Sequence, residues 1–394
     1  MANSILTPTA VTREALAVLH QKLNFIGNIN RTYDKQFAIE GAKIGSTVNV
    51  RLPNQYVTRD GATLSAQDTT ETSVPLAISN QTGVDLNFTS TDLTLSLQDF
   101  SARILEPAMS VLAATLESRA LAMALDVYQN VNNIGSAAAF KTVLQSRKVL
   151  QDALAPVSDR SIVLNTQDNV DMVDTLKGLF NDSTTISRQN KEGLLGRTGG
   201  FDFYENTLMP TQATGTAAAA TGYLVNGASQ VGSVLAVNTG SATFKKGDII
   251  TLVGVNRVHP ETKADTGSLQ PFVVTADYAG GAGNVSISPA IVVTGGRQNV
   301  TASPASGAAI AKVGAASGVY KPSLAFHKDA FAFATADLVM PGGVDFAARE
   351  VMDGLSMRIV RQYSISNDQF PTRLDVLWGC KTIRPELACR ILSN

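Results

Sequence analysis

The longest helical pattern in the chain extends from about residue 99 to residue 130. Hydrophobic residues recur there at steps of three and four, which places them on one helical face: Met109, Leu112, Leu116, Ala120, Met123 and Val127. The polar positions fade after Glu117, so the second half is expected to be covered on several sides. A continuous helix of about 30 residues would be roughly 45 Å long. A central core helix of an α/β protein explains the same pattern, whereas the uncharged run between Glu106 and Glu117 is too short to cross a bilayer.

Alternating hydrophobic and polar positions indicate strands between residues 47 and 89. The alternating hydrophobic residues form three runs: Val48, Val50 and Leu52, then Val74, Leu76 and Ile78, then Val84, Leu86 and Phe88. A polar, threonine-rich segment with the turn signal Asp60-Gly61 separates the first two runs. The pattern predicts a long two-stranded excursion with a flexible polar tip. Such a hairpin is marginal alone in water and should rest on another surface, although an internal hairpin of a larger sheet fits equally well.

Shorter patterns complete the outline of a mixed chain. Helices are predicted at 9–25, 137–154 and 166–176, and strands at 161–165, 201–205, 357–365 and 373–379. The first helix could lie on the body of the chain or on a neighbouring subunit. These elements predict an α+β fold.

A different composition begins at residue 211. The segment TQATGTAAAATG has the low complexity of a linker, and a second bland segment covers 295–318. Between them, short strands are predicted at 222–226, 233–237, 248–255, 272–276 and 285–287. The pattern indicates a small all-β barrel inserted into a host domain.

Composition narrows the possible classes of protein. The chain has 394 residues and a net charge of -1, so its overall charge does not attract nucleic acid or anionic membrane. Its two cysteines, Cys380 and Cys389, form neither a disulfide framework nor a zinc motif. The N-terminal sequence lacks the pattern of a signal peptide, so we expect folding inside a cell.

A search for catalytic motifs finds none. The histidines His20, His259 and His327 fall in separate predicted elements, and neither a phosphate-binding loop nor a GxSxG motif is present. Asp202 and Glu205 could share a ligand across the FDFYE segment, although solvated strand residues are the simpler interpretation. We therefore predict no catalytic residue, no cofactor and no metal site, and hence no enzyme.

The segment TGSATFKKGDIITLVGVNRVHPETK (239–263) resembles the insertion domain in coat proteins of short-tailed double-stranded-DNA phages. The preceding GGFDFYENTLMP resembles the strand and proline turn before that insertion. The order of SIVLNTQDNV, LAFHKDAFAFATADLVMP, GLSMRIVRQYSI and VLWGCKTIRPELACRI agrees with the same family. The resemblance covers roughly 161–391, and the N-terminal third agrees in layout.

The resemblance implies the Hong Kong 97 phage capsid fold with an inserted β-barrel. It assigns an N-terminal arm to 1–44, an extended β loop to 45–90, and the spine helix and peripheral domain to 91–155. The axial domain would begin at 156–220, the barrel would occupy 221–300, and 301–394 would complete the axial and peripheral domains. The implied function is that of a major capsid protein in the virion, assembled in the bacterial host cytoplasm as hexamers and pentamers around packaged DNA. A scaffolding protein and a portal are the implied partners, DNA contact would be non-specific, and no membrane is involved.

Some capsids of this fold join subunits by an isopeptide bond from a lysine on the extended loop. The extended loop predicted here contains no lysine, and a guanidinium is a poor nucleophile, so we expect a non-covalent shell. The expected inter-subunit contacts are charged residues of the loop and of a barrel turn: Arg51, Arg59, Asp60, Lys245, Lys246 and Asp248. Two other hypotheses remain, a β-rich attachment or surface protein and an enzyme that uses Asp202 and Glu205.

Overall fold

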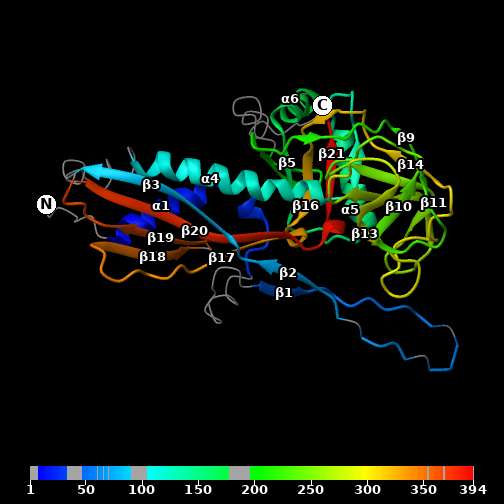
Figure 1. Ribbon diagram of the computed structural model, residues 1–394, viewed down its shortest axis with the longest axis horizontal. Coiled ribbons are helices and arrows are strands. Elements are labelled where there is room, and N and C mark those ends of the chain that lie inside the picture. Colours follow the sequence, from blue (N-terminus) through cyan, green and yellow to red (C-terminus); the bar gives the residue numbers. More distant parts are fainter. Residues whose placement is uncertain are drawn as a thin grey trace. The chain divides into compact units, whose positions relative to one another are not determined.

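The computed structural model describes residues 8–32, 47–59, 61–64, 66–69, 71–89, 104–176, 196–352, 355–366 and 369–393. The chain divides into two compact units. Unit 1 comprises Met1–Val50, Ser73–Leu121 and Phe331–Ile383, and unit 2 comprises Arg51–Thr72, Ala122–Ala330 and Arg384–Asn394. The observed α+β composition confirms the predicted fold class (Figure 1).

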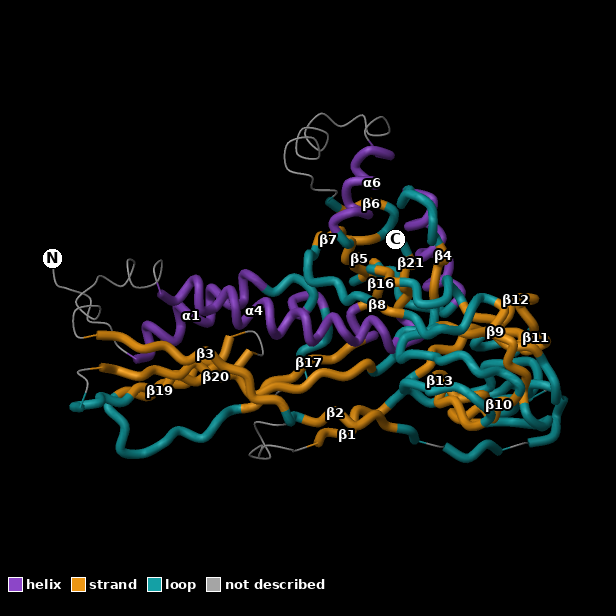
Figure 2. Tube along the Cα trace, turned by 45° about the horizontal axis from the view of Figure 1, so that its top comes forward, coloured by secondary structure: helices purple, strands orange, loops and turns teal. Residues whose placement is uncertain are grey.

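Unit 1 is built on a five-stranded sheet in which β20 is central. The order is β17 (Phe331–Ala336), β20 (Gln369–Thr382), β19 (Leu355–Arg361) and β18 (Phe346–Met352), and β3 (Asn80–Thr89) pairs with β20. Helices α1 (Pro8–Lys22) and α4 (Glu106–Leu121) lie side by side along this sheet (Figure 2). The buried face of α1, with Ala15, Leu16 and Leu19, packs on unit 1 of its own chain.

The predicted long helix is shorter than its hydrophobic pattern suggests. After α4 the chain forms a 3-10 turn, η4 (Ala122–Asp126), and then a short strand, β4 (Asn130–Asn132). β4 pairs in parallel with β21 (Ala388–Leu392), and the Gln129 side chain donates to the Glu386 carbonyl oxygen at 2.7 Å. This pairing with the C-terminal segment overrides the local helix propensity. The predicted start at residues 99–103 lies outside the described residues.

The segment Glu106–Asp126 is apolar and long enough to cross a bilayer by length and composition. Within this segment, 56% of the 18-residue stretch that meets the hydropathy criterion is buried inside the protein. A core helix passes the same test, so this finding is weak evidence for a membrane span.

The predicted two-stranded excursion is only partly a separate hairpin. β1 (Thr47–Arg51) and β2 (Ser73–Ala77) form their own two-stranded sheet, as expected. The third run became β3, which pairs with β20 from Asn80 to Thr89 and therefore belongs to the large sheet. Gly83 permits this close pairing, because a Cβ there would lie 2.4 Å from the Leu374 carbonyl oxygen.

A mixed six-stranded sheet lies in unit 2, in the order β4-β21-β16-β5-β7-β6. Its remaining strands are β16 (Ser323–His327), β5 (Arg160–Leu164), β7 (Phe201–Glu205) and β6 (Arg197–Thr198). Helices α5 (Phe140–Asp152) and α6 (Thr166–Leu176) pack on this unit. β16 and β5 are buried along their whole length, which explains their unbroken hydrophobic runs.

The inserted module is a closed six-stranded barrel in the order β10-β13-β12-β11-β14-β9. Its strands are β9 (Ala220–Val225), β10 (Gly232–Asn238), β11 (Ile249–Val258), β12 (Asp265–Val274), β13 (Gly283–Ile291) and β14 (Ala309–Lys312). The barrel thus ends at Lys312, beyond the predicted boundary at 300. The sequence pattern missed β14 because this strand has only four residues, AIAK, and only Ile310 adds a large hydrophobic side chain to the core.

The alanine-rich segment after residue 211 is packed structure rather than a free linker. β8 (Gln212–Ala213) pairs with β15 (Val319–Tyr320) where the chain enters and leaves the barrel. Ala217 is fully buried, and a Cβ on Gly215 would lie 2.1 Å from the Thr243 carbonyl oxygen. Close packing therefore requires small residues at positions 215 and 217, whereas Ala218, Ala219 and Ala220 are exposed.

Candidate functional site

The described residues contain no group of three or more His, Cys, Asp or Glu side chains that could hold a metal ion. Asp202 and Glu205 do not converge on one site. They are three positions apart on β7, which places them on opposite faces of the strand. Arg197 lies 3.6 Å from the Asp202 carboxylate, whereas Glu205 accepts a hydrogen bond from Asn169 at 2.7 Å. Each carboxylate thus has its own partner.

The most exposed candidate region is the segment between β1 and β2, residues 52–72, which we call the extended loop. Its hydrophobic side chains include Tyr56, 55% exposed, and Leu64, 81% exposed. At its base, Arg51 and Glu71 form an exposed ion pair at 3.3 Å. Arg59 donates to the Gly61 carbonyl oxygen, and Asp60 lies outside the described residues. The exposed side chains of Tyr56 and Leu64 therefore leave apolar surface on the extended loop that another protein surface could cover.

A side chain holds the two limbs of the extended loop together. The Gln67 amide accepts a hydrogen bond from the Val57 backbone N–H at 2.9 Å and donates to the Val57 carbonyl oxygen. Nearer the base, the Leu52 N–H donates to the Thr72 carbonyl oxygen at 2.8 Å. The Gln67 amide therefore replaces one rung of a β ladder where strand pairing has ended.

The barrel turn that contains Lys245, Lys246 and Asp248 binds within its own chain. Asp248 is fully buried and accepts hydrogen bonds from the backbone N–H groups of Gly215 and Lys245, both at 3.0 Å. The Lys246 ammonium lies 2.9 Å from the Asp126 carboxylate on η4. Because Asp248 has no exposed surface, we do not carry it forward as a contact between subunits.

Arg390 is the centre of the junction between this turn and the six-stranded sheet. It is fully buried on β21 and donates to the Gln212 side-chain oxygen at 2.9 Å and to the Gly247 carbonyl oxygen at 3.0 Å. Burial lowers the pKa of Arg390 to about 10, and the nearby carboxylates of Asp126 and Asp248 oppose that shift. Arg390 therefore stays charged near neutral pH and joins the C-terminal strand to the barrel.

A second buried cluster secures the end of the chain. Asp168 accepts hydrogen bonds from Ser323, from Asn165 at 3.0 Å and from Ser393 at 2.6 Å. Burial raises the pKa of Asp168, and the three donors partly offset this effect. The cluster connects α6, β16 and the C-terminal residues, and its tightly bonded carboxylate has a structural role.

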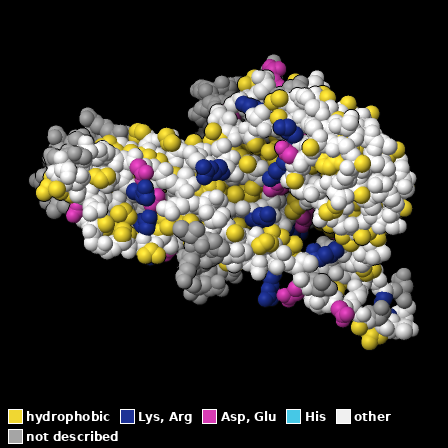
Figure 3. Space-filling view, in the orientation of Figure 1, with side chains coloured by type: hydrophobic (Ala, Val, Ile, Leu, Met, Phe, Trp, Pro, Cys, Tyr) yellow, Lys and Arg dark blue, Asp and Glu magenta, His cyan; other side chains and the backbone are white. Residues whose placement is uncertain are grey.

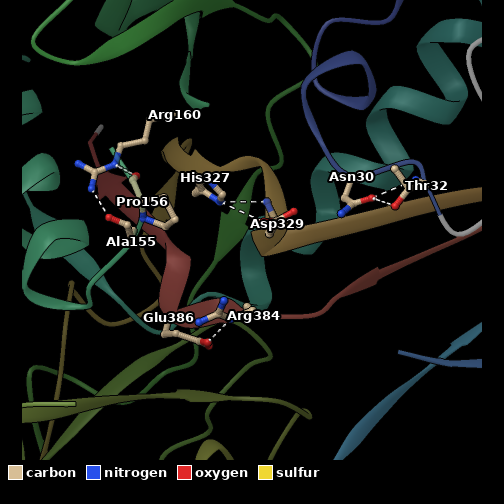
Figure 4. Close-up of polar contacts among 9 residues, drawn as sticks. All are labelled: Asn30, Thr32, Ala155, Pro156, Arg160, His327, Asp329, Arg384 and Glu386. Atoms are coloured by element: carbon tan, nitrogen blue, oxygen red, sulfur yellow. Dashed lines mark hydrogen bonds and ion pairs between the residues drawn. The ribbon is translucent and has the colours of Figure 1, made fainter. Parts of the chain in front are cut away.

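His327 lies close to the points where the chain leaves unit 2 after Ala330 and returns at Arg384 (Figure 4). Its ring is buried, and Nδ1 accepts a hydrogen bond from the Asp329 N–H at 3.2 Å. Burial lowers the pKa of His327, with Arg160 and Arg384 contributing, whereas Asp329 and Asp159 oppose the shift. The Arg384 N–H donates to the Ala330 carbonyl oxygen at 3.0 Å, which connects the two chain crossings.

Charge is mixed on the face of the molecule shown in Figure 3, where Lys, Arg, Asp and Glu side chains are interspersed among hydrophobic ones. Sequence reasoning identified the exposed loop and the Lys245–Asp248 turn as notable. It did not find Arg390, Gln212 and Asp168, because isolated polar residues in apolar segments carry no sequence signal of their burial. The one sequence signal of burial is the position of Arg390 within the hydrophobic segment ACRIL, residues 388–392.

Comparison with known proteins gives one extensive match. The protein-family model "P22 coat protein - gene protein 5" matches residues 26–392. No curated protein sequence matches the chain.

Solved structures resemble the chain to different extents. A structure from Mycobacterium phage Che8 has 13% identity and a TM-score of 0.48, covering 94% of this chain and 90% of that chain. The capsid structure of the cyanophage P-SCSP1u has 10% identity and a TM-score of 0.42, with coverage of 90% and 85%. The CUS-3 coat protein I-domain has 29% identity and a TM-score of 0.19, covering 23% of this chain and 94% of that domain. Since all three TM-scores lie below 0.5, only the match to the family carries weight.

Proposed function

The chain belongs to the P22 coat protein family, and on that premise we propose that it assembles without covalent cross-links into the icosahedral shell around a phage's double-stranded DNA. As a major capsid protein, it forms the shell of the virion. The match over residues 26–392 carries this conclusion, because it includes both the host fold and the inserted barrel. No enzymatic step is part of the proposal.

The extended loop supports assembly by non-covalent contact. Tyr56, Val57 and Leu64 are 55%, 38% and 81% exposed, which is unfavourable in an isolated subunit. Burial against an adjacent subunit would remove this apolar surface from water. Obligate interfaces commonly bury about 2,000–5,000 Å² in total, and a hexamer would repeat each contact around its ring.

We propose that the architecture corresponds to the Hong Kong 97 capsid fold. β1, the extended loop and β2 would form its extended β hairpin, without the β3 part of the predicted 45–90 because β3 pairs with β20. α4 would be its spine helix, and the six-stranded sheet of unit 2 its axial domain. The barrel would be an insertion in the axial domain, because β8 and β15 pair where the chain enters and leaves it. Hexamers and pentamers would be the assembly units.

The partners follow from the same family membership. A scaffolding protein would direct closure of the shell in the bacterial host cytoplasm, and a portal would occupy one vertex. Packaged DNA would touch the interior without being read, which agrees with the net charge of -1. Arg51, Arg59, Asp60, Lys245 and Lys246 remain the proposed polar contacts between subunits, and two of them also form ion pairs within their own chain, Arg51 with Glu71 and Lys246 with Asp126.

The test is assembly of the purified full-length chain with and without its phage's scaffolding protein, observed by negative-stain electron microscopy. Closed shells of uniform size are expected. The shells are then boiled in detergent and separated on a gel, where a single monomer band is expected. A chain that stays monomeric under both conditions would contradict the capsid function, and a ladder of covalent multimers would contradict non-covalent assembly.

A further inference from the structure

The base of the extended loop rests on the inserted barrel of its own chain, and both segments belong to unit 2. We define the loop stem as residues 53–56 and the barrel seat as residues 295–298, between β13 and β14. The Arg297 guanidinium donates to the Pro53 carbonyl oxygen at 3.2 Å. This contact joins residues that are far apart in sequence and that no sequence pattern connects.

Gly296 allows the two backbones to approach closely. A Cβ built on Gly296 would lie 2.0 Å from the carbonyl oxygen of Gln55 and 3.1 Å from the amide nitrogen of Tyr56. Gly296 itself does not have a positive φ, unlike the neighbouring Gly295 at +83°. Glycine is therefore needed at position 296 to make room for the loop stem rather than to satisfy the backbone conformation.

The barrel seat is held in place by the half-buried side chains of Lys263 and Asn299. The Lys263 ammonium donates to the carbonyl oxygens of Pro260 at 2.6 Å and Gly296 at 2.5 Å. The Asn299 side chain donates to the Ala290 carbonyl oxygen at 2.7 Å and accepts from the Val292 N–H at 2.9 Å. These bonds attach the seat to β13 and to the turn between β11 and β12, so it is a rigid support.

Beyond the seat, the extended loop is stiffened by the two hydrogen bonds between the Gln67 side chain and the Val57 backbone, which we call the clamp. A segment of this length with little burial of its own would otherwise sample many conformations, and each residue fixed on assembly costs about 1–2 kcal/mol of backbone entropy. Fixing the loop before assembly lowers that cost at the moment of contact. The contacts at the loop stem and at the clamp together fix the conformation of the extended loop within one subunit.

We propose that the inserted barrel positions the extended loop of its own subunit, so that the loop stem is already held on the barrel when a neighbouring copy arrives. Gly296 and Arg297 are the positioning residues. They contact the loop stem of the same chain, Gly296 by close packing against the Gln55 backbone and Arg297 by its hydrogen bond to Pro53. The inference rests on the proposed function, since it assigns the barrel a role in assembly. It also makes the seating a property of the unassembled chain.

The test uses Gly296→Ala in the full-length unassembled chain, with Gly342→Ala as the matched control. Gly342 has neither a positive φ nor any atom within 4 Å of a built Cβ, so the same substitution should be harmless there. Trypsin cleavage after Arg59 reports on the loop, because Arg51 and Arg59 are the only Lys or Arg residues in 45–90. We expect Gly296→Ala to raise the initial rate of cleavage after Arg59 about three- to tenfold, since proteolysis requires local release of the chain.

Arg297→Ala is the second variant, because it removes the bond to Pro53 without crowding the seat. We expect a smaller rise in cleavage after Arg59 and, for both variants, a slower assembly of shells. Circular dichroism and the thermal transition should match those of the wild type, which would show that the barrel is folded.

Three results would count against the proposal or its premise, and they are distinguishable. Wild-type cleavage rates in both folded variants would overturn the seating of the loop. Faster cleavage with unchanged assembly would overturn its role in positioning. Failure of the wild-type chain to form shells would contradict the proposed function instead, while the cleavage comparison would still decide whether the loop is seated.

Discussion

The guanidinium of Arg390 donates a hydrogen bond to the carbonyl oxygen of Gly247 at 3.0 Å, within a junction that is closed to solvent. This bond joins the last strand of the chain to the barrel turn that precedes β11. Glycine is favoured at position 247 because the backbone of the turn has a φ of +95° there, which other residues rarely adopt. The barrel is therefore joined to the six-stranded sheet of unit 2 by the charged Arg390 side chain as well as by the chain segments of β8 and β15.

Arg390→Met should destabilise unit 2. The substitution leaves the buried Gln212 side-chain oxygen without its Arg390 donor, whereas the Gly247 carbonyl oxygen keeps the Gln212 amide as a donor at 2.7 Å. A buried acceptor without a partner costs about 1–3 kcal/mol, so we expect the free energy of unfolding of unit 2 to fall by about that amount in a urea titration of the unassembled chain. Lys328→Ala, at an exposed position, is the control and should change the stability by about 0.5 kcal/mol or less. Equal stability of the two variants would show that the junction does not depend on Arg390.

The Lys246–Asp126 pair should contribute far less. Its side chains are 49% and 34% exposed, so solvent screens their 2.9 Å contact. A double-mutant cycle with Lys246→Ala and Asp126→Ala should give a coupling energy of about 1 kcal/mol or less, decreasing in 1 M salt. A coupling that is larger and independent of salt would mean that the pair is desolvated in solution.

The burial of His327 predicts a dependence of stability on pH. Because the folded-state pKa of His327 is lowered, the unfolded chain binds a proton first as the pH falls below about 6.5. The contribution of the neutral ring is therefore complete above about pH 6.5 and is lost as the pH falls toward the folded-state pKa. His327→Gln should flatten this part of the stability curve, measured by urea unfolding between about pH 5 and 8. Parallel curves for wild type and variant would exclude His327 as the source.

Glu117 should be important for the stability of unit 1. Its carboxylate accepts hydrogen bonds from the backbone N–H groups of Phe25 and Ile26, the latter at 3.2 Å, and it is almost fully buried. This charge-assisted contact secures the turn after α1 against α4. Glu117→Ala should lower the free energy of unfolding by about 2–4 kcal/mol, whereas Glu106→Ala at the exposed start of α4 should have little effect. Chemical denaturation of both variants is the measurement, and similar losses would contradict a special role for Glu117.

Periodicity identified most of the secondary structure correctly. Side-chain spacing reports directly on which face of an element is buried, and this is why α1, α5, β5 and the barrel strands β9, β10, β11 and β13 were predicted near their observed positions. For β12 only the end was predicted, at 272–276, because its first five residues, from Asp265, are all exposed. Pairing over long sequence distances was not predictable in the same way. The β3 run looked like part of an outlying hairpin, but its ten residues pair with β20, almost three hundred positions later in the chain.

The sequence by itself determined the α+β class, the inserted all-β module and, through the resemblance of its segments, the coat protein family. It could do so because hydrophobic spacing and segment order are local properties of the chain. Only the tertiary structure decided where the helical pattern of α4 ends, that Asp248 is buried, and that Gly296 receives the loop stem. Those outcomes depend on which distant segment of the backbone lies next to each group and forms hydrogen bonds with it. A charged turn such as the one around Asp248 has the same sequence whether water or its own chain surrounds it, so its burial cannot be predicted locally.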